Sequence, residues 1–312
     1  MTIEKVVSGA AGGTELLIDE FNKHVDEKIQ SHFHIVPSRL RGHVEGKIPI
    51  YWAHDLVGDP ECDHLKAGGY NQYEKLVFVS NWQMQQFINA YGIPWRKCVV
   101  IRNAIEPIAP VQKDNTTIKL IYHTTPHRGL EILAPVFEKL CERYDNIELD
   151  VFSSFKIYNN PERDKQYEHV FDMLKANPKV RMHGSVDYRE VREAVANSHI
   201  FAYPSIWMET SCRSLMEAMT AGLVCVHPNY GALYETAANW TMMYQYQDNK
   251  RDHANLFANQ LCVAIDSVGS EELVMRTRSQ STYASVFYNW ALVKQEWENL
   301  LGSILYSKGI KW

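Results

Sequence analysis

Two glutamates flank the start of a predicted helix in the stretch PSIWMETSCRSLMEAMTAG. Glu209 precedes the helix, and Glu217 lies eight positions further, about two turns inside it. Thr210 or Ser211 is a suitable N-cap, and the N–H groups at the start of such a helix are free to bind an anion. A carboxylate accepts hydrogen bonds from two hydroxyls at once, as vicinal diols require. The pattern therefore predicts an anion between two hydroxyl-bearing rings, as in a diphosphate flanked by two sugars.

Short apolar runs alternate with amphipathic segments along most of the chain, which is typical of α/β proteins with parallel sheets. After residue 248 the pattern is wholly helical. A polar segment with prolines, residues 106–117, separates two sets of strands and is predicted to be a linker. Two such domains would bind ligands at the carboxyl ends of their strands. The expected strands are residues 33–39, 48–54, 75–80, 98–103, 118–124, 147–153, 180–184, 200–205 and 223–228.

The bulk composition indicates a globular protein with sizeable cores. Hydrophobic residues make up 46% of the 312 residues, and the formal net charge of -5 differs from that of a strongly basic nucleic-acid binder. The six cysteines occur singly, the N-terminus lacks a signal-peptide core, and no uncharged run reads as a membrane span. We therefore expect a cytoplasmic protein without stable membrane insertion, and leave attachment to a membrane surface open.

Eight segments occur in an order and spacing that resemble those of glycosyltransferase family 4. These enzymes are retaining, have the GT-B fold and use nucleotide-diphosphate sugars. The resemblance covers most of the chain. It rests on GAAGGTE, WAHD, the pair VFVSNWQMQQF and VIRNAIEP, TTPHRGLEIL, HGSVDYREVREAVANSHIFAYPS, the E-x7-E motif with EAMTAG, and GALYE.

The resemblance implies two Rossmann-like domains with parallel sheets facing a central cleft. Residues 1–109 would form the acceptor-side domain, together with a returning C-terminal helix at 289–312. Residues 110–288 would bind the nucleotide sugar, which is a co-substrate, so no cofactor is expected. A UDP-sugar is favoured over a GDP-sugar, and the enzyme would be a hexosyl- or pentosyltransferase.

The resemblance also implies roles for individual residues. Glu209 would bind hydroxyls of the donor sugar and Glu217 those of the ribose, while Arg128 would take the place of the family's phosphate-binding lysine. His54 would face the reacting sugar, so the catalytic set is His54, Arg128 and Glu209. The remaining donor-binding residues would be Gly12, Gly13, Asn103, Ser185, Thr210, Ser211 and Cys212.

The chain departs from the family at one phosphate-binding position. The family usually has an arginine five residues before the clamp lysine, and this chain has His123 there. A neutral imidazole is a weak replacement for that charge. No two aspartates are spaced as D-x-D, the pattern that holds Mn²⁺ or Mg²⁺ in other glycosyltransferases. We therefore expect no metal site, with Arg128 and the helix start stabilising the leaving diphosphate.

Two other functions remain open at this level. One is a sugar-nucleotide epimerase on the same fold, and the other is a binding module that has lost catalysis, which only His123 supports. The acceptor is unidentified: a glycan, a lipid or a small molecule is favoured over a modified DNA base. Residues 1–110 carry 11 Lys and Arg against 13 Asp and Glu, which weakens a DNA acceptor.

Overall fold

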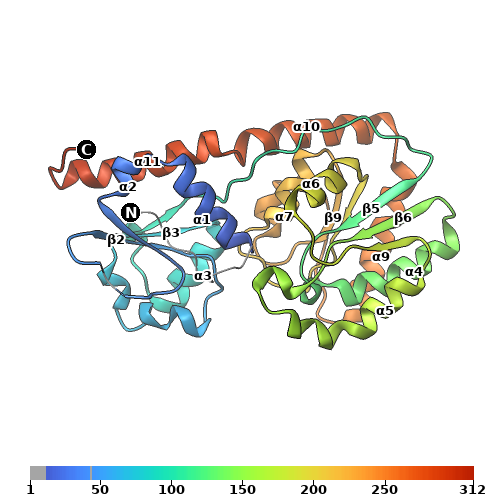
Figure 1. Cartoon of the computed structure of the whole chain (residues 1–312), viewed down its shortest axis with the longest axis horizontal. Coiled ribbons are helices and arrows are strands. Elements are labelled where there is room, and N and C mark those ends of the chain that lie inside the picture. Colours follow the sequence, from blue (N-terminus) through green and yellow to red (C-terminus); the bar gives the residue numbers. More distant parts are fainter. Residues whose placement is uncertain (1–11, 43) are drawn as a thin grey trace. The chain divides into compact units, whose positions relative to one another are not determined.

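The computed structural model describes residues 12–42 and 44–312, and its internal contacts divide the chain into two compact units (Figure 1). The first unit runs to Ile105 and includes Tyr288–Trp312, and the second is Glu106–Phe287. The domain boundaries predicted from the sequence lie within four residues of these points. The segment predicted to be a linker, residues 106–117, contains no helix or strand and belongs to the second unit.

The described part of the first unit is built on a parallel sheet in the order β1-β2-β3-β4. Its strands are β1 (Phe33–Pro37), β2 (Ile48–Trp52), β3 (Lys75–Phe78) and β4 (Cys98–Val100). Its α-helices are α1 (Gly13–His24), α2 (Glu27–Gln30), α3 (Asn81–Tyr91) and α11 (Trp290–Ser307). Three short 3-10 helices complete it: η1 (Pro60–Leu65), η2 (Gly69–Gln72) and η3 (Trp95–Lys97).

Alternate residues of these strands enter different cores, as the two-residue period of a strand requires. On β2, Ile50 and Trp52 pack with α1 and α11, whereas Tyr51 packs with α3 and η1. Trp297 of α11 is fully buried, with its ring 4.9 Å from Phe21 and 5.1 Å from Trp52. The C-terminal helix is thus part of the core of the first unit.

The second unit is built on a parallel sheet in the order β10-β9-β8-β5-β6-β7. Its strands are β5 (Ile118–Tyr122), β6 (Ile147–Val151), β7 (Val180–Met182), β8 (Ile200–Ala202), β9 (Val224–Pro228) and β10 (Met242–Tyr244). The order reverses direction between β5 and β8, which is where open α/β sheets bind ligands. Every strand expected from the sequence is present, and β10 is an addition.

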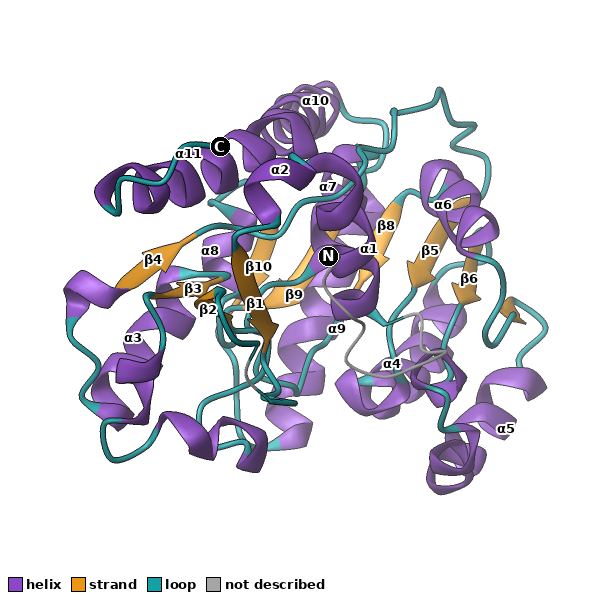
Figure 2. Ribbon diagram, turned by 60° about the vertical axis from the view of Figure 1, so that its left-hand side comes forward, coloured by secondary structure: helices purple, strands orange, loops and turns teal. Residues whose placement is uncertain are grey.

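Helices cover both faces of this sheet (Figure 2). One face carries α6 and α7, with α10 packed on α7, and the other carries α4 and α9, with α5 beside α4. The α-helices are α4 (Leu130–Arg143), α5 (Glu168–Ala176), α6 (Tyr188–Asn197), α7 (Arg213–Thr220), α8 (Leu233–Ala237), α9 (Lys250–Ser267) and α10 (Glu271–Phe287). The 3-10 helices are η4 (Pro126–Arg128), η5 (Phe155–Tyr158) and η6 (Pro161–Tyr167).

The sheets are buried on both sides, which explains why their strands read as continuous apolar runs. All five residues of β9 are buried, as are all three of β8. None of the helices in the described ranges is both long enough and apolar enough to cross a bilayer.

Candidate active site

Glu209 lies in the loop between β8 and α7, and its backbone is fixed by the segment GALYE. Its carbonyl accepts a hydrogen bond from the N–H of Ala232 at 2.7 Å, and Glu209 and Gly231 form an isolated β-bridge. Gly231 has a φ of 60°, and a Cβ there would lie 2.5 Å from the Glu209 carbonyl oxygen. Only glycine fits so close to another backbone in this conformation. The GALYE segment therefore positions the first of the two acids.

A second glycine brings Arg128 to the same place. Arg128 ends η4, and the next residue, Gly129, has a φ of 114°. A Cβ on Gly129 would lie 2.1 Å from the carbonyl oxygen of Pro204. The loop that follows β5 is thus in direct contact with the loop that follows β8. This contact joins two segments that are far apart in the sequence.

Arg128 and Glu209 form a buried ion pair. Arg128 Nη1 donates a hydrogen bond to Glu209 Oε1, although the residues are 81 positions apart. The hydroxyl of Tyr203 donates to the same carboxylate oxygen, and Arg128 Nε donates to Thr125 Oγ1 at 3.2 Å. The side chains of Arg128 and Glu209 are only 21% and 5% exposed. The pair is therefore largely shielded from water. Charged groups attract each other more strongly in such a setting than they do in water.

The surroundings keep Arg128 charged and Tyr203 protonated. Burial lowers the pKa of Arg128, but the Glu209 carboxylate more than compensates, and the pKa ends well above its usual value. Burial, with the nearby Glu209 charge, raises the pKa of Tyr203. Tyr203 therefore remains a hydrogen-bond donor at neutral pH. Glu209 is oriented by two donors before any ligand arrives.

Helix α7 begins later than the sequence suggests. The predicted N-cap at Thr210 or Ser211 is wrong: Cys212 is the N-cap, and the first helical residue is Arg213. The bridge between Glu209 and Gly231 keeps the chain extended, which delays the helix by one to two residues. The N–H groups that an α-helix leaves without an intrahelical carbonyl partner at its start therefore belong to Cys212 and the residues after it.

Glu217 lies one turn into α7 and is bound by side chains that had no role in the sequence prediction. It is 3% exposed and accepts a hydrogen bond from the hydroxyl of Tyr188, the first residue of α6. Arg213 Nη2 lies 3.8 Å from the same carboxylate oxygen. Burial, followed by the Glu217 charge, raises the pKa of Tyr188, which therefore acts as a donor.

The thiol of Cys212 is affected by both acids. Its pKa is raised well above the usual value, first by burial and then by Glu209, with a smaller contribution from Glu217, while Arg128 lowers it. Both glutamates and Arg128 thus act on one buried point at the start of α7. A thiol in this setting stays protonated and is a poor nucleophile.

Several polar atoms near the carboxyl ends of β5 and β6 have no hydrogen-bond partner among the described residues. They are His123 Nε2, His127 Nδ1 and Ser153 Oγ. Burial lowers the pKa of His123 to about 3, so its imidazole is neutral, as expected for a weak replacement of arginine. Burial also lowers the pKa of His127 to about 3, and its ring stacks on Phe155 at 5.2 Å. Buried polar groups normally have partners, so these atoms are available to a ligand.

Residues 102–256 match the family Glycosyl transferases group 1. This segment is a glycosyltransferase group 1 domain. The domain contains the Arg128–Glu209 pair and Glu217 together with the strands that position them. It also contains the residues GALYE that fix the backbone of Glu209.

The curated relatives that the chain matches belong to phosphatidylinositol N-acetylglucosaminyltransferases. The Homo sapiens relative is 26% identical over 141 residues, which cover 44% of this chain and 28% of the human protein. The Arabidopsis thaliana relative is 21% identical over 273 residues, which cover 84% of this chain and 56% of the plant protein. The chain thus spans about half the length of these relatives, or less.

Solved structures resemble most of this chain in fold. The crystal structure of a glycosyltransferase from Rickettsia africae has a TM-score of 0.70 at 18% identity, covering 98% of this chain and 84% of that one. The Anabaena protein Alr3699/HepE in complex with UDP has a TM-score of 0.66 at 16% identity, covering 82% and 72%. The predicted GT-B class of α/β fold with parallel sheets is confirmed.

Three other residues of this domain were predicted from the sequence to bind the donor. Ser185 follows β7 and the left-handed Gly184, and is half-buried. Ser211 and Thr210 lie in the loop before α7. No contact of these three residues tests their assignment to the donor, which stays a prediction.

Four predicted site residues lie near or in the first unit's strands and helices. His54 follows β2, with its N–H donating to Ser38 Oγ at 2.8 Å and its ring 4.5 Å from that of Trp52. Asn103 follows β4 and is buried. Gly12 is the N-cap of α1, with a φ of -71° that any residue can adopt, and Gly13 is its first residue. The rest of the predicted glycine loop, residues 9–11, lies outside the described residues, and the roles of these four stay predictions.

Proposed function

We propose that the chain is a retaining glycosyltransferase that takes its sugar from a nucleotide-diphosphate sugar, with UDP as the nucleotide. The observation that carries the proposal is the buried Arg128–Glu209 pair at the carboxyl edge of the sheet, with Glu217 beyond it on α7. The glycosyltransferase group 1 domain supports the reaction class. The UDP complexes of Alr3699/HepE and of the pneumococcal O-GlcNAc transferase GtfA, both of this fold, support the nucleotide.

In this mechanism Arg128 binds the diphosphate and Glu209 orients the donor sugar. The guanidinium has five donors, of which Nη1 and Nε already bond to Glu209 and Thr125, so others remain for phosphate oxygens. As the glycosidic bond breaks, negative charge grows on the leaving diphosphate. Arg128 and the start of α7, which supplies about half a positive charge, stabilise that charge.

Glu217 accepts hydrogen bonds from the ribose hydroxyls, and Tyr188 holds the carboxylate in place. One acid therefore orients the ring on each side of the diphosphate, which explains why the two acids straddle the start of one helix. The chemistry requires no metal ion in this scheme, because Arg128 is fixed in position before the donor binds.

The proposal is tested by nucleotide release from a panel of UDP-N-acetylglucosamine, UDP-glucose, UDP-galactose and GDP-mannose. The names of the curated relatives support N-acetylglucosamine as the first sugar and phosphatidylinositol as the first acceptor to test. We expect UDP release that requires Arg128, and a product whose anomeric configuration by NMR equals that of the donor. An inverted product would exclude retention, and GDP-mannose as the sole donor would exclude UDP.

The neutral His123 favours a second candidate, a binding module that holds the nucleotide sugar without turning it over. At this position the site lacks the second phosphate-binding cation of the resembled family. Tight UDP binding by calorimetry, with no release from any donor and acceptor of the panel, would establish this alternative. Formation of an epimerised sugar nucleotide would instead indicate an epimerase.

A further inference from the structure

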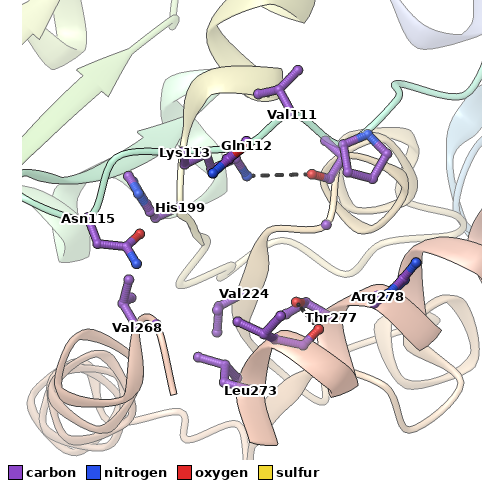
Figure 3. Close-up of a pocket in the computed structure, with 15 residues that line it drawn as sticks. Val111, Gln112, Lys113, Asn115, His199, Val224, Val268, Leu273, Thr277 and Arg278 are labelled. Atoms are coloured by element: carbon purple, nitrogen blue, oxygen red, sulfur yellow. Dashed lines mark hydrogen bonds between the residues drawn. The ribbon is translucent and has the colours of Figure 1, made fainter. Parts of the chain in front are cut away.

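The second unit has a cavity of about 820 Å³ at the amino ends of β8 and β9 (Figure 3). Its lining includes His199 and Val224, which lie where these strands begin, residues 110–113 and 115 of the linker, and residues at the turn from α9 to α10. Arg128 and Glu209 follow the carboxyl ends of β5 and β8. Because these strands are parallel, the cavity lies at the opposite edge of the sheet from the candidate active site.

The charge in this cavity is positive. Of the 15 residues that line it, Lys113 and Arg278 are cationic and none is acidic. Lys113 Nζ makes one hydrogen bond, a long one of 3.5 Å to the carbonyl of Ala221, and forms no ion pair with any described residue (Figure 3). His199 adds no charge, because burial lowers its pKa to about 4. A partly buried ammonium group without a carboxylate is unusual, since buried charges are normally paired.

The environment of Lys113 disfavours its own charge. Burial lowers the pKa of Lys113 to about 8, whereas the nearby Cys225 raises it slightly. An anion bound beside the ammonium would supply the missing compensation. Arg278 is exposed at the rim and adds a second positive charge.

The rest of the cavity is mainly aliphatic. One side is closed by Asn115, whose amide nitrogen would lie 2.8 Å from a Cβ on Gly269, so the linker packs tightly against the turn between α9 and α10. The volume is in the range of small-molecule sites, which are also mostly apolar with a few polar groups. The lining valine and leucine side chains are Val111, Val224, Val268, Leu273 and Val274.

We propose that this cavity is a second ligand site, for a small organic anion with an aliphatic body whose charged group pairs with Lys113. The aliphatic walls take the body, and Lys113 and Arg278 take the charge. The site is separate from the donor site and does not depend on the proposed glycosyl transfer.

The test is titration of the full chain with octanoate in a calorimeter at pH 7, with 1-octanol and inorganic phosphate as comparisons. Octanoate combines both features, whereas the alcohol lacks the charge and phosphate lacks the body. We expect saturable binding of octanoate and clearly weaker binding of the other two. Absence of saturable octanoate binding, or equal binding of octanol, would overturn the proposal.

Variants locate the binding. Lys113→Met keeps the length of the side chain and removes the charge, and should weaken octanoate by about tenfold or more, the factor for one lost charge-assisted hydrogen bond. Lys113→Arg should keep most of the binding. Val274→Asp, at an exposed position of the wall, should also weaken octanoate binding, because it places a like charge beside the ligand. Lys139→Met, on the exposed surface of α4, is the matched control and should bind as the wild type does.

Measurements with UDP distinguish binding in this cavity from binding at the donor site. Lys113→Met should leave UDP affinity unchanged, and saturating UDP should leave octanoate affinity unchanged. Competition between the two ligands would show that octanoate occupies the donor site, and unchanged octanoate affinity in Lys113→Met would show that it binds elsewhere. Either result would overturn the assignment, whatever the outcome of the activity assays.

Discussion

The two edges of the second sheet differ in whether a buried cation has an acidic partner. At the carboxyl edge, Arg128 is paired with Glu209, and Glu217 is held by Tyr188 and Arg213. At the amino edge, Lys113 lies in a cavity and has no acidic partner among the residues that the structure describes. The first arrangement is preorganised, so its groups keep their positions when a ligand arrives or leaves. The second lacks a counter-charge, which a ligand can supply.

This difference matters for what each edge can do. Preorganised charges stabilise a transition state because they need not reorient during the reaction. A buried cation without a counter-charge favours binding of an anion, because the anion offsets the free-energy cost of burying an unpaired charge. We therefore assign chemistry to the carboxyl edge and binding alone to the amino edge.

The largest effect should come from removing the cation of the paired edge. Arg128→Ala should lower turnover by about 10²–10³, the cost of losing one preorganised donor to a developing charge, with a smaller loss of donor binding. Arg128→Lys should be partly active, because the resembled family uses lysine here. The measurements are initial rate and donor KM for both variants.

Stability separates this role from a purely structural one. Arg128→Ala also leaves Glu209 buried without its cation and should lower the free energy of unfolding by roughly 3 kcal/mol. The double variant Arg128→Ala/Glu209→Gln should recover stability, since it removes the unpaired charge, but not the rate. Recovery of the rate as well would mean that the pair only maintains the fold.

The second largest effect concerns Glu217. Glu217→Ala should weaken UDP binding by roughly 1.5–3 kcal/mol, the value for a charge-assisted hydrogen bond, and Glu217→Asp should lie between it and the wild type. Tyr188→Phe removes one orienting hydrogen bond and should cost only about 1 kcal/mol. UDP affinity by calorimetry is the readout, and an unchanged value in Glu217→Ala would exclude the ribose role.

The sequence predicted elements better than it predicted where they end. Runs such as Ile118–Tyr122 are rich in apolar residues because the sheet is covered on both faces. The strand was expected to continue to Thr124, but His123 and Thr124 leave the ladder to form the loop that carries Arg128. Strand β10, Met242–Tyr244, was missed because three residues without β-branching give no strand signal.

The site was predictable in its acids and not in their partners. The spacing of Glu209 and Glu217 is a local property that sequence shows directly. The Arg128–Glu209 bond depends on how closely Gly129 approaches Pro204, which only tertiary packing decides. Tyr203 and Tyr188 were missed for the same reason, although both lie in segments that resemble the family's base-binding region.

A smaller effect is expected on the pH dependence of stability, because a neutral histidine is buried near each edge of the sheet. Burial lowers the pKa of His123, near the carboxyl edge, to about 3 and that of His199, near the amino edge, to about 4. The unfolded chain binds a proton near pH 6.5 and the folded chain does not. Each histidine therefore contributes fully to stability above about pH 6.5, and the contribution falls by about 1.4 kcal/mol per pH unit below it, until the folded pKa is reached.

Urea unfolding at pH 7, 6 and 5 measures this slope. His123→Gln and His199→Gln should each make stability fall less steeply between pH 6.5 and pH 5. His169→Gln, at an exposed position of α5, is the control and should keep the slope of the wild type. A wild-type slope in His123→Gln would mean that the folded and unfolded chains protonate His123 alike, and the pKa of His123 would then not be lowered by burial.

The smallest expected effect is that of chelation on the paired edge. The sequence contains no D-x-D pattern that could hold a divalent ion against the diphosphate, and Arg128 already supplies a fixed charge there. Donor turnover should therefore be unchanged in excess EDTA after prolonged dialysis.

The informative control is Arg128→Ala in the same assay, because an enzyme that has lost its fixed cation is the form in which an added ion could help most. Partial rescue of Arg128→Ala by Mg²⁺, with no response of the wild type, would agree with charge compensation by Arg128. Loss of wild-type activity in EDTA that Mn²⁺ restores would place the compensating charge on a metal. The carboxyl edge would then also need a bound ion to complete its charges, and the contrast with the amino edge would no longer hold.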